Sequence, residues 1–373
     1  MTMLPRCVLI ERPTEYQELL ARHGTREQAA FFLTQRGGSI DEIAARHHQH
    51  REHHGHVLGA VPAEWRRAAI SRADLDRFLF EPEDIIVVLG QDGLVANVAK
   101  YLNGQPVIGL NPHPDRYPGV LVNHPPDAVD DLLRDVSHGH ATFQNRTMVQ
   151  ARLDDGQGLV ALNEIFIGHA SHQSARYQIS FRDQTERQSS SGVIIATGTG
   201  GTGWAASLHH ERHSQLILPR PEEDRLAFFV REPWPSPASA TTLVEGELND
   251  KDALEITSEL PDNGVLFGDG IETDQLHLDW GQHVHIGIAD GHLNAAGTLP
   301  ADAASPLGST HGDGQFSVKN GDFADWMRTS IKDEDLADDV TNIAAHEGLG
   351  VEEARKLVRT AVEQRYTAPA TND

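Results

Sequence analysis

The segment with the clearest chemical potential is Gly90-Gln91-Asp92-Gly93. It lies between an apolar run at 85–89, which predicts a buried strand, and a helical pattern at 94–102. Ligands of α/β proteins bind at the carboxyl ends of parallel strands, and the N–H groups that begin a helix favour phosphate. Asp92 would then lie among phosphates or sugar hydroxyls. The alternative is an ordinary strand-to-helix turn in which Asp92 caps the helix.

A second candidate segment, residues 197–204, follows a predicted strand over 192–196. Four glycines and three threonines in eight residues pack poorly, but their backbone N–H groups and hydroxyls can converge on an oxyanion. The segment is neither a P-loop nor a dinucleotide-binding fingerprint, because Gly-Lys-Ser/Thr is absent and the glycine spacing differs. The sequence therefore predicts a phosphate-binding loop of another kind, with a flexible loop as the alternative.

A third candidate is the pair Asn163-Glu164, which interrupts an otherwise apolar strand pattern over 159–167. Two adjacent polar residues disturb the alternation and indicate a strand end that faces a cleft. Asparagine can donate and accept hydrogen bonds, and a carboxylate can accept them from ribose hydroxyls.

Three zones of the chain must position these segments. Residues 1–140 alternate short apolar runs with helical patterns, as in an α/β domain with a parallel sheet. In residues 141–300 apolar and polar side chains alternate with a period of two, and the connections are rich in glycine and proline, which predicts a β-rich second domain. Residues 301–373 begin with a Gly/Ser/Asp-rich linker, and the helical patterns after it predict a small helical extension.

The composition excludes several classes of protein. The chain of 373 residues has a formal net charge of −24, which argues against broad binding to nucleic acid or to an anionic membrane. Cys7 is the single cysteine, so disulfides within the chain and cysteine-based zinc sites are excluded. No apolar run is long enough for a membrane span and the N-terminus lacks a signal-peptide pattern, so we expect a cytoplasmic enzyme.

Histidines cluster between His47 and His56. His50 and His54 lie one helical turn apart and could form a metal-binding face. A solvated or structural helix is the simpler interpretation, and we expect no protein-bound metal.

Together and in this order, Gly90-Gln91-Asp92-Gly93, Asn163-Glu164 and the segment 197–204 resemble the signature motifs of NAD kinases, which are related to the diacylglycerol kinases. The mitochondrial-type branch is the most similar, since Arg46-His47-His48 and the segment 106–111 also match it. The resemblance covers roughly residues 40–295 and implies the two-domain fold of that family.

The resemblance also implies a reaction, its partners and its residues. NAD kinases transfer the terminal phosphoryl group of ATP, supplied with Mg²⁺, to the 2′-hydroxyl of the adenosine ribose of NAD, and they assemble as homo-oligomers. Asp92 matches the aspartate that accepts the hydroxyl proton. The residues matched to NAD binding are Asp92, Gly93, Asn163, Glu164, Ser191, Thr202, Gly203, Trp204 and Ser207. Those matched to ATP and its phosphates are Gly90, Thr197, Gly198, Thr199, Gly200 and Gly201. Gly268-Asp269-Gly270 resembles a further element near the family's site.

Three departures from the family pattern bear on specificity. Gln91 replaces the second glycine of the usual loop, Trp204 stands where many members have tyrosine, and Ser191 where most bacterial members have aspartate. A lipid or sugar kinase of the same superfamily and a non-catalytic sensor of NAD(P) are the alternatives. The sequence leaves open ATP or polyphosphate as donor, NAD or NADH as acceptor, the oligomer number and feedback by NADP(H).

Overall fold

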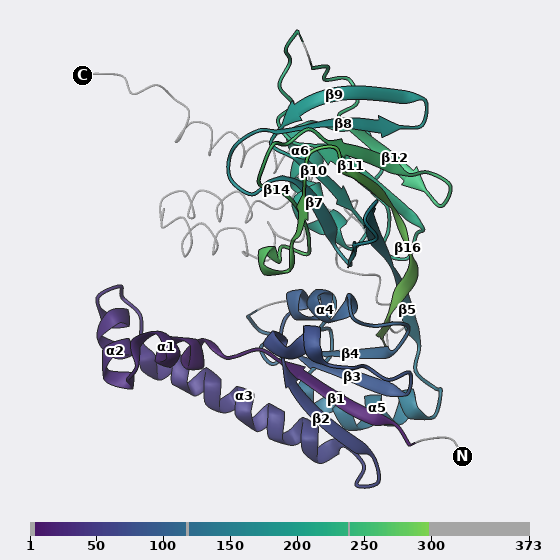
Figure 1. Ribbon diagram of the computed structural model, residues 1–373. Helices are drawn as coiled ribbons and strands as arrows, with labels where there is room; N and C mark the ends of the chain where they lie inside the picture. The colour runs from purple at the N-terminus through teal and green to yellow at the C-terminus, as the bar shows by residue number, and fades with distance from the viewer. Residues whose placement is uncertain (1–3, 117–118, 238, 298–373) are drawn as a thin grey trace, which may run out of the picture. The chain divides into compact units, whose positions relative to one another are not determined.

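The computed structural model describes residues 4–116, 119–237 and 239–297 (Figure 1). The predicted linker and helical extension over 301–373 lie outside the described residues. The boundaries 1–140, 141–300 and 301–373 stay a prediction.

The first part of the chain contains a parallel sheet with helices on both faces (Figure 1). Its strands, in the spatial order β2-β1-β3-β4, are β2 (Arg66–Ser71), β1 (Arg6–Glu11), β3 (Asp84–Leu89) and β4 (Pro106–Leu110). Side chains alternate between the faces, so Ile86 and Val88 pack with α4 (Asp92–Ala99), whereas Val87 packs with α3 (Ile40–Ala60) and α5 (Val129–Ser137). The predicted strands at 85–89 and 106–110 are confirmed.

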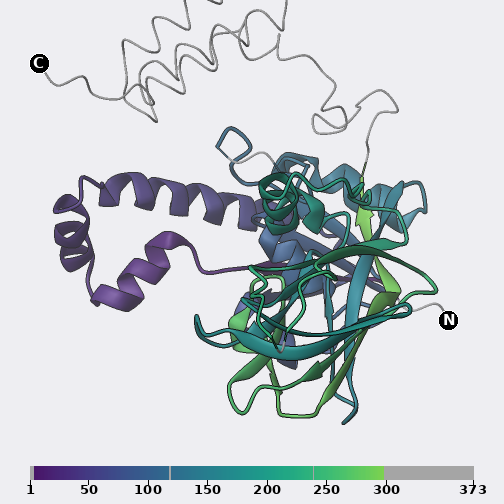
Figure 2. The same cartoon turned by 90° about the horizontal axis from the view of Figure 1, so that it is seen from above.

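Two short helices extend this part of the molecule. The helices α1 (Glu15–His23) and α2 (Arg26–Thr34) pack on the N-terminal half of α3, away from the sheet (Figure 2). Thr14 begins α1 with a capping box, in which its side chain accepts from the N–H of Gln17 and the Gln17 side chain accepts from the N–H of Thr14. The short 3₁₀ turns here are η1 (Arg72–Arg77) and η2 (Pro126–Ala128).

The β-rich part consists of strands from two sheets. The larger sheet continues the parallel one in the order β4-β16-β13-β8-β9, and β5 pairs with β16 and β6. Its added strands are β5 (Phe143–Leu153), β6 (Gly158–Ala161), β8 (Ala175–Phe181), β9 (Gln184–Ser190), β13 (Leu254–Ser258) and β16 (His283–Ala296). The second sheet, in spatial order, contains β12 (Glu245–Asn249), β11 (Arg225–Val230), β10 (Val193–Ala196), β7 (Glu164–His169), β14 (Gly264–Gly268) and β15 (Leu276–Leu278).

The core of the β-rich part lies between these sheets. Ile195 and Phe228 point into it, whereas their neighbours Ile194 and Phe229 pack on the other face with α6 (Trp204–Glu211). The remaining short turns are η3 (Gly200–Thr202) and η4 (Glu272–Asp274).

The strand β16 connects the two parts. It pairs antiparallel with β13 and β5, and its Asn294 and Ala295 pair parallel with Pro106 and Val107 of β4. The strand predicted over 159–167 is interrupted, because β6 ends at Ala161 and β7 begins at Glu164. The polar pair therefore does lie at a strand end.

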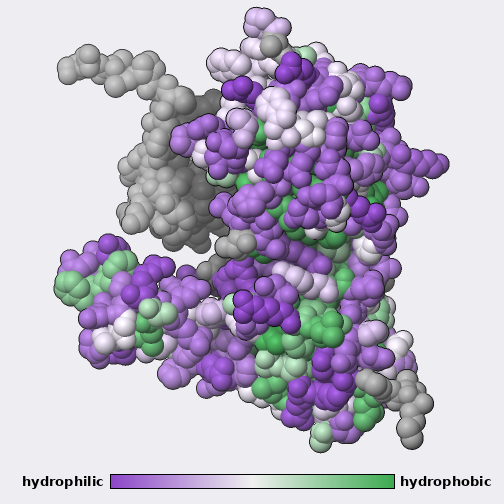
Figure 3. Space-filling model, viewed as in Figure 1, coloured by the Kyte–Doolittle hydropathy of each residue, from purple (hydrophilic) through white to green (hydrophobic). Residues whose placement is uncertain are grey.

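The exposed surface is largely hydrophilic on the face shown in Figure 3, as the net charge of −24 leads one to expect. In the described part of the chain, every helix is too short or too polar to span a lipid bilayer.

Candidate active site

The carboxylate of Asp92 is held by the backbone of a neighbouring loop. Its Oδ1 accepts from the N–H groups of Leu121 and Val122 at 2.8 and 2.9 Å, and its Oδ2 accepts from Val120 at 2.9 Å. Gln91 is the N-cap of α4 and Asp92 is its first residue, so the interpretation of Asp92 as a helix cap is wrong. Among the described residues Oδ2 receives only one donor, which leaves room for a substrate hydroxyl at that oxygen.

Glycine at position 109 lets this loop approach β4. A Cβ atom at Gly109 would lie 2.0 Å from the carbonyl oxygen of Leu121, so any side chain would push the loop away. The loop is tied to the strand by hydrogen bonds from the N–H of Asn111 to His124 O and from the N–H of His124 to Gly109 O. Because the same loop presents its N–H groups to Asp92, Gly109 indirectly sets the position of the carboxylate.

The segment 197–204 is anchored by Thr197 at the break between β6 and β7. The Thr197 hydroxyl donates to Leu162 O at 2.6 Å and accepts from the N–H groups of Thr199 and Gly200. A Cβ at Gly200 would lie 2.2 Å from the carbonyl oxygen of Asn163. The Thr197 hydroxyl and Gly200 therefore determine the conformation of the loop itself. Contacts of Thr197 and Gly200 with phosphate stay a prediction.

The other half of the segment is open to solvent. Thr202 and Gly203 are exposed, whereas Thr197, Gly198 and Thr199 are buried. The part of the predicted loop that is accessible to a ligand is therefore its end, where η3 leads into α6.

Asp269 holds the Asn163-Glu164 pair from the other side. Its carboxylate accepts from the N–H groups of Leu162 at 3.1 Å and Asn163 at 2.7 Å, and its own N–H donates to Glu164 O. Asp269 adopts a left-handed backbone conformation, with φ of 55°, which is uncommon for a residue other than glycine. The structure thus brings three segments together at a single strand break, although Thr197 is 35 residues from Leu162 and Asp269 is 106 residues from Asn163 in the chain.

Glu164 and Asp269 are two carboxyl groups with perturbed proton affinity. Burial and, to a smaller extent, the nearby negative charge of Asp269 together raise the pKa of Glu164 to about 7. Burial also raises the pKa of Asp269 to about 6, against the opposing effect of the N–H groups of Asn163 and Leu162 and of the Lys100 charge. At neutral pH the pair can therefore donate as well as accept hydrogen bonds with ligand hydroxyls.

Arg146 on β5 is a buried cation that the sequence analysis missed. The residue is only 5% exposed, and its guanidinium donates from Nη2 to Gln144 at 2.8 Å and from Nη1 to Thr199 Oγ1 at 3.4 Å. Within the described part of the chain, Nε has no hydrogen-bond partner and no carboxylate lies within 4.0 Å of the guanidinium. Nothing in the sequence distinguishes this arginine from a surface arginine in a strand.

The charge of Arg146 connects Asp92 with the threonine-rich segment. Burial lowers the pKa of Arg146, and the negative charges of Glu222 and Asp92 oppose that effect. Arg146 is thus hydrogen-bonded to Thr199 and in electrostatic contact with Asp92 and Glu222, and no carboxylate of the described residues forms an ion pair with it. Such a group is suited to receive a phosphate.

Trp204 packs against protein side chains. Its ring stacks on Phe166 with 5.8 Å between centroids, and the guanidinium carbon of Arg231 lies 4.9 Å from the ring centroid. Ser191 is nearby, because its N–H donates to Arg231 O. Ser207 is exposed on α6, where its hydroxyl contacts Gly203 O. Their assignment to NAD stays a prediction.

The histidine cluster on α3 binds a carboxylate of the protein. His50 Nε2 and His54 Nδ1 both contact Glu11 Oε2, at 3.1 and 3.0 Å. Within residues 4–297 as described, no three His, Cys, Asp or Glu side chains are arranged to hold a metal ion. The contacts of His50 and His54 with Glu11 agree with the interpretation of this segment as a structural helix.

No family model matches the chain, but several curated proteins are similar to it. The rat protein "NAD kinase 2, mitochondrial" is 24% identical over 314 residues, which cover 61% of this chain and 73% of the rat protein. The human protein of that name is 24% identical over 311 residues, covering 61% of this chain and 70% of the human protein. The NAD kinase of Chlorobaculum tepidum is 28% identical over 127 residues, or 33% of this chain and 44% of that protein.

A solved structure agrees with these relatives. Yeast NADH kinase, in a crystal structure complexed with NADH, matches with a TM-score of 0.50 and 16% identity, over 80% of this chain and 85% of the yeast chain. The chain is thus similar to NAD kinases in sequence and to yeast NADH kinase in fold. The predicted fold, an α/β domain with a parallel sheet and a β-rich second domain as in NAD kinases, is confirmed.

Proposed function

We propose that the chain is an NAD kinase, which transfers the terminal phosphoryl group of ATP to the 2′-hydroxyl of the adenosine ribose of NAD and so forms NADP. The observation that carries this proposal is the placement of Asp92. Its carboxylate is oriented by loop N–H groups, has an open position at Oδ2, and lies within electrostatic reach of the buried Arg146.

Asp92 would act as the general base. As the 2′-oxygen forms its bond to the γ-phosphorus, the bond from that phosphorus to the β,γ-bridging oxygen breaks, ADP leaves, and the hydroxyl proton passes to Asp92 Oδ2. The transition state of phosphoryl transfer is loose, so positioning and charge stabilisation supply most of the catalysis. Arg146 would stabilise the negative charge on the equatorial phosphoryl oxygens.

The remaining residues would position the two substrates. Asn163 and Glu164 would hydrogen-bond the NAD, because both lie at the strand break beside Asp269. The other residues that we assign to NAD are Gly93, Ser191, Thr202, Gly203, Trp204 and Ser207. Those assigned to the ATP phosphates are Gly90, Thr197, Gly198, Thr199, Gly200 and Gly201.

Magnesium would arrive with the nucleotide. The described residues contain no three-ligand cluster that could hold a divalent ion by itself, so the ATP phosphates would be its main ligands. When bound, Mg²⁺ would neutralise part of the triphosphate charge.

An Asp92→Asn variant tests the proposal. Asparagine keeps an acceptor at Oδ1 for Leu121 and Val122 but cannot take the proton, so we expect kcat for NADP formation from NAD and MgATP to fall by about 10²–10⁴-fold with folding retained. Asp131→Asn, at an exposed residue of α5, is the matched control and should leave kcat unchanged.

The outcome also decides between the proposed function and its alternatives. Near-normal turnover of Asp92→Asn would remove Asp92 from the mechanism. Binding of NAD and ATP by the unmodified protein without any NADP formation would favour a sensor. No specific observation favours a lipid or sugar kinase.

A homo-oligomer and a cytoplasmic location are also proposals. The rat and human relatives are named as mitochondrial proteins, so the location is to be measured directly. Light scattering on the purified chain would give the oligomer number, and a monomer would contradict the first of these proposals.

A further inference from the structure

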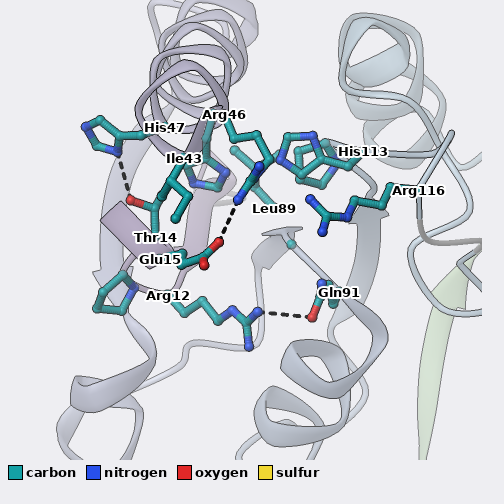
Figure 4. Close-up of a pocket in the computed structure, with 14 residues that line it drawn as sticks. Arg12, Thr14, Glu15, Ile43, Arg46, His47, Leu89, Gln91, His113 and Arg116 are labelled. Atoms are coloured by element: carbon teal, nitrogen blue, oxygen red, sulfur yellow. Dashed lines mark hydrogen bonds and ion pairs between the residues drawn. The ribbon is translucent and has the colours of Figure 1, made fainter. Parts of the chain in front are cut away.

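A pocket lies beside the Gly90-Gln91 loop, at the carboxyl edge of the parallel sheet (Figure 4). It is lined by the segments that follow β1, β3 and β4 and by one face of α3. In open α/β sheets, this edge is where ligands bind. Its lining includes Gly90 and Gln91 of the loop before Asp92, and Arg46 and His47 of the segment that matches the mitochondrial-type branch.

The pocket is positively charged in a strongly acidic chain. Arg12, Arg46 and Arg116 line it, and their side chains point toward the space between them (Figure 4). Glu15 is the only acidic residue among the described residues that line the pocket. Three guanidinium groups against one carboxylate form a local field that attracts anions, although the chain as a whole carries −24.

The arginines keep donors that a ligand can use. Arg46 Nη2 donates to Glu15 Oε2 at 2.8 Å, and Arg12 Nη2 donates to Gln91 Oε1 at 3.0 Å. A guanidinium has five N–H donors in a planar fork that fits phosphate oxygens, so one bond leaves capacity on each side chain. The Arg12 contact joins the Gln91 side chain to that of Arg12 in the lining of the pocket (Figure 4).

Burial and nearby positive charges lower the pKa of two histidines that line the pocket. Burial lowers the pKa of His113, and the positive charges of His50, His53, Arg46 and Arg116 lower it further. Burial lowers the pKa of His47 as well, with His48, Arg51 and His50 adding to the effect and Glu11 opposing it. Cations held close together destabilise one another, and a bound polyanion would relieve that repulsion.

The size of the pocket limits what can enter it. Its volume is about 140 Å³, below the roughly 300–1,000 Å³ of sites that enclose a whole drug-sized ligand. The space therefore suits phosphate groups and not a complete nucleotide. Gly90 and Gln91, the two residues before Asp92 in the chain, line the pocket, so it lies next to the loop that carries the carboxylate.

We propose that this pocket binds the condensed phosphate chain of the phosphoryl donor, with Arg12 and Arg46 as its main ligands. The chemistry fits the triphosphate of a nucleotide and an inorganic polyphosphate alike. The role as a donor site rests on the proposed function, whereas the binding of a phosphate chain does not.

The test compares the Arg12→Gln and Arg46→Gln variants with the unmodified protein. Titration calorimetry measures the Kd of ATP and of tripolyphosphate without NAD, and initial rates give KM for each donor. Each variant loses a charge-assisted contact to phosphate, so we expect the Kd of the phosphate ligand to rise about 10-fold or more. Arg134→Gln, at an exposed arginine of α5, is the matched control and should leave Kd unchanged.

The readouts separate the possible results. Weaker binding of ATP in the variants, with no tripolyphosphate binding by any protein, supports the pocket as a nucleotide site. Weaker binding of both, with long-chain polyphosphate supporting turnover, supports polyphosphate as a donor. Unchanged Kd values for both ligands, in variants that unfold at the normal temperature, would overturn the proposal.

Failure of the proposed function gives a different pattern. If the unmodified protein binds tripolyphosphate, the two variants lose that binding, and NADP is never formed, then the pocket is correct and the NAD kinase assignment is wrong. If NADP is formed with unchanged KM for the donor in both variants, the assignment is correct and the pocket proposal is wrong.

Discussion

We predict that Arg146→Met makes the ligand-free protein more stable and the enzyme slower. Arg146 is 5% exposed, its Nε is without a hydrogen-bond partner in the described residues, and burial lowers its pKa. A lowered pKa in an arginine means that the folded protein disfavours the charged form, in spite of the contacts to Gln144 and Thr199. Methionine has a similar length, no charge and no polar hydrogen to bury.

The expected magnitude follows from these contacts. Replacing buried ionic groups by apolar ones of similar volume is often neutral or stabilising by about 1–4 kcal/mol. Because the hydrogen bond to Gln144 is lost at the same time, we expect the free energy of unfolding to rise by only about 1 kcal/mol. For a chain of this size that corresponds to an increase in Tm of about 2 °C. Loss of a preorganised donor to the transferring phosphoryl group should lower kcat by about 10²–10³-fold.

The assay is thermal unfolding with and without ATP, together with initial rates of NADP formation. ATP should raise the Tm of the unmodified protein more than that of Arg146→Met, because only the former provides the buried cation. Arg152→Met is the control on the same strand: Arg152 is 58% exposed and paired with Asp290, and its replacement should change stability by less than about 0.5 kcal/mol. A methionine variant that is less stable than the unmodified protein and has full activity would refute the reasoning.

Two further predictions concern the strand break and the loop that holds Asp92. Gly109→Ala should displace the loop, because the new Cβ would lie 2.0 Å from Leu121 O, and we expect kcat to fall by at least about 10²-fold. Gly55→Ala on α3 is the control and should keep full activity, because no atom lies within 4 Å of its Cβ. Equal rates in the two variants would contradict the role of Gly109. Because the pKa of Glu164 is raised from 4.5 to about 7, the folded chain holds a proton that the unfolded chain releases, so this residue contributes stability below pH 4.5 that is lost as pH rises to 7. Glu164→Gln should therefore lose less stability than the unmodified protein between pH 4.5 and 7, by up to about 3 kcal/mol in denaturant titrations, and parallel pH profiles would contradict the perturbed pKa.

Local patterns were sufficient for the segments that carry the motifs. The apolar runs at 85–89 and 106–110 predict β3 and β4, because strands buried on both faces contain little except branched apolar residues. The polar pair Asn163-Glu164 predicts a strand end, because a strand that is buried on both faces does not accommodate two adjacent polar side chains. The order of the three motifs was enough to predict the fold.

The sequence by itself determined where strands end and which loops carry Asp92, Asn163 and Glu164. Only the tertiary structure decided that Arg146 is buried next to those loops, that Gly109 admits the loop that orients Asp92, and that Arg12 and Arg46 share a pocket with Gln91. The reason is that hydrophobic periodicity is a local signal, whereas the burial of a charge depends on what packs against it from distant parts of the chain. Arg146 and Arg152 stand in one strand six residues apart, and only their neighbours make one a buried cation and the other a surface ion pair.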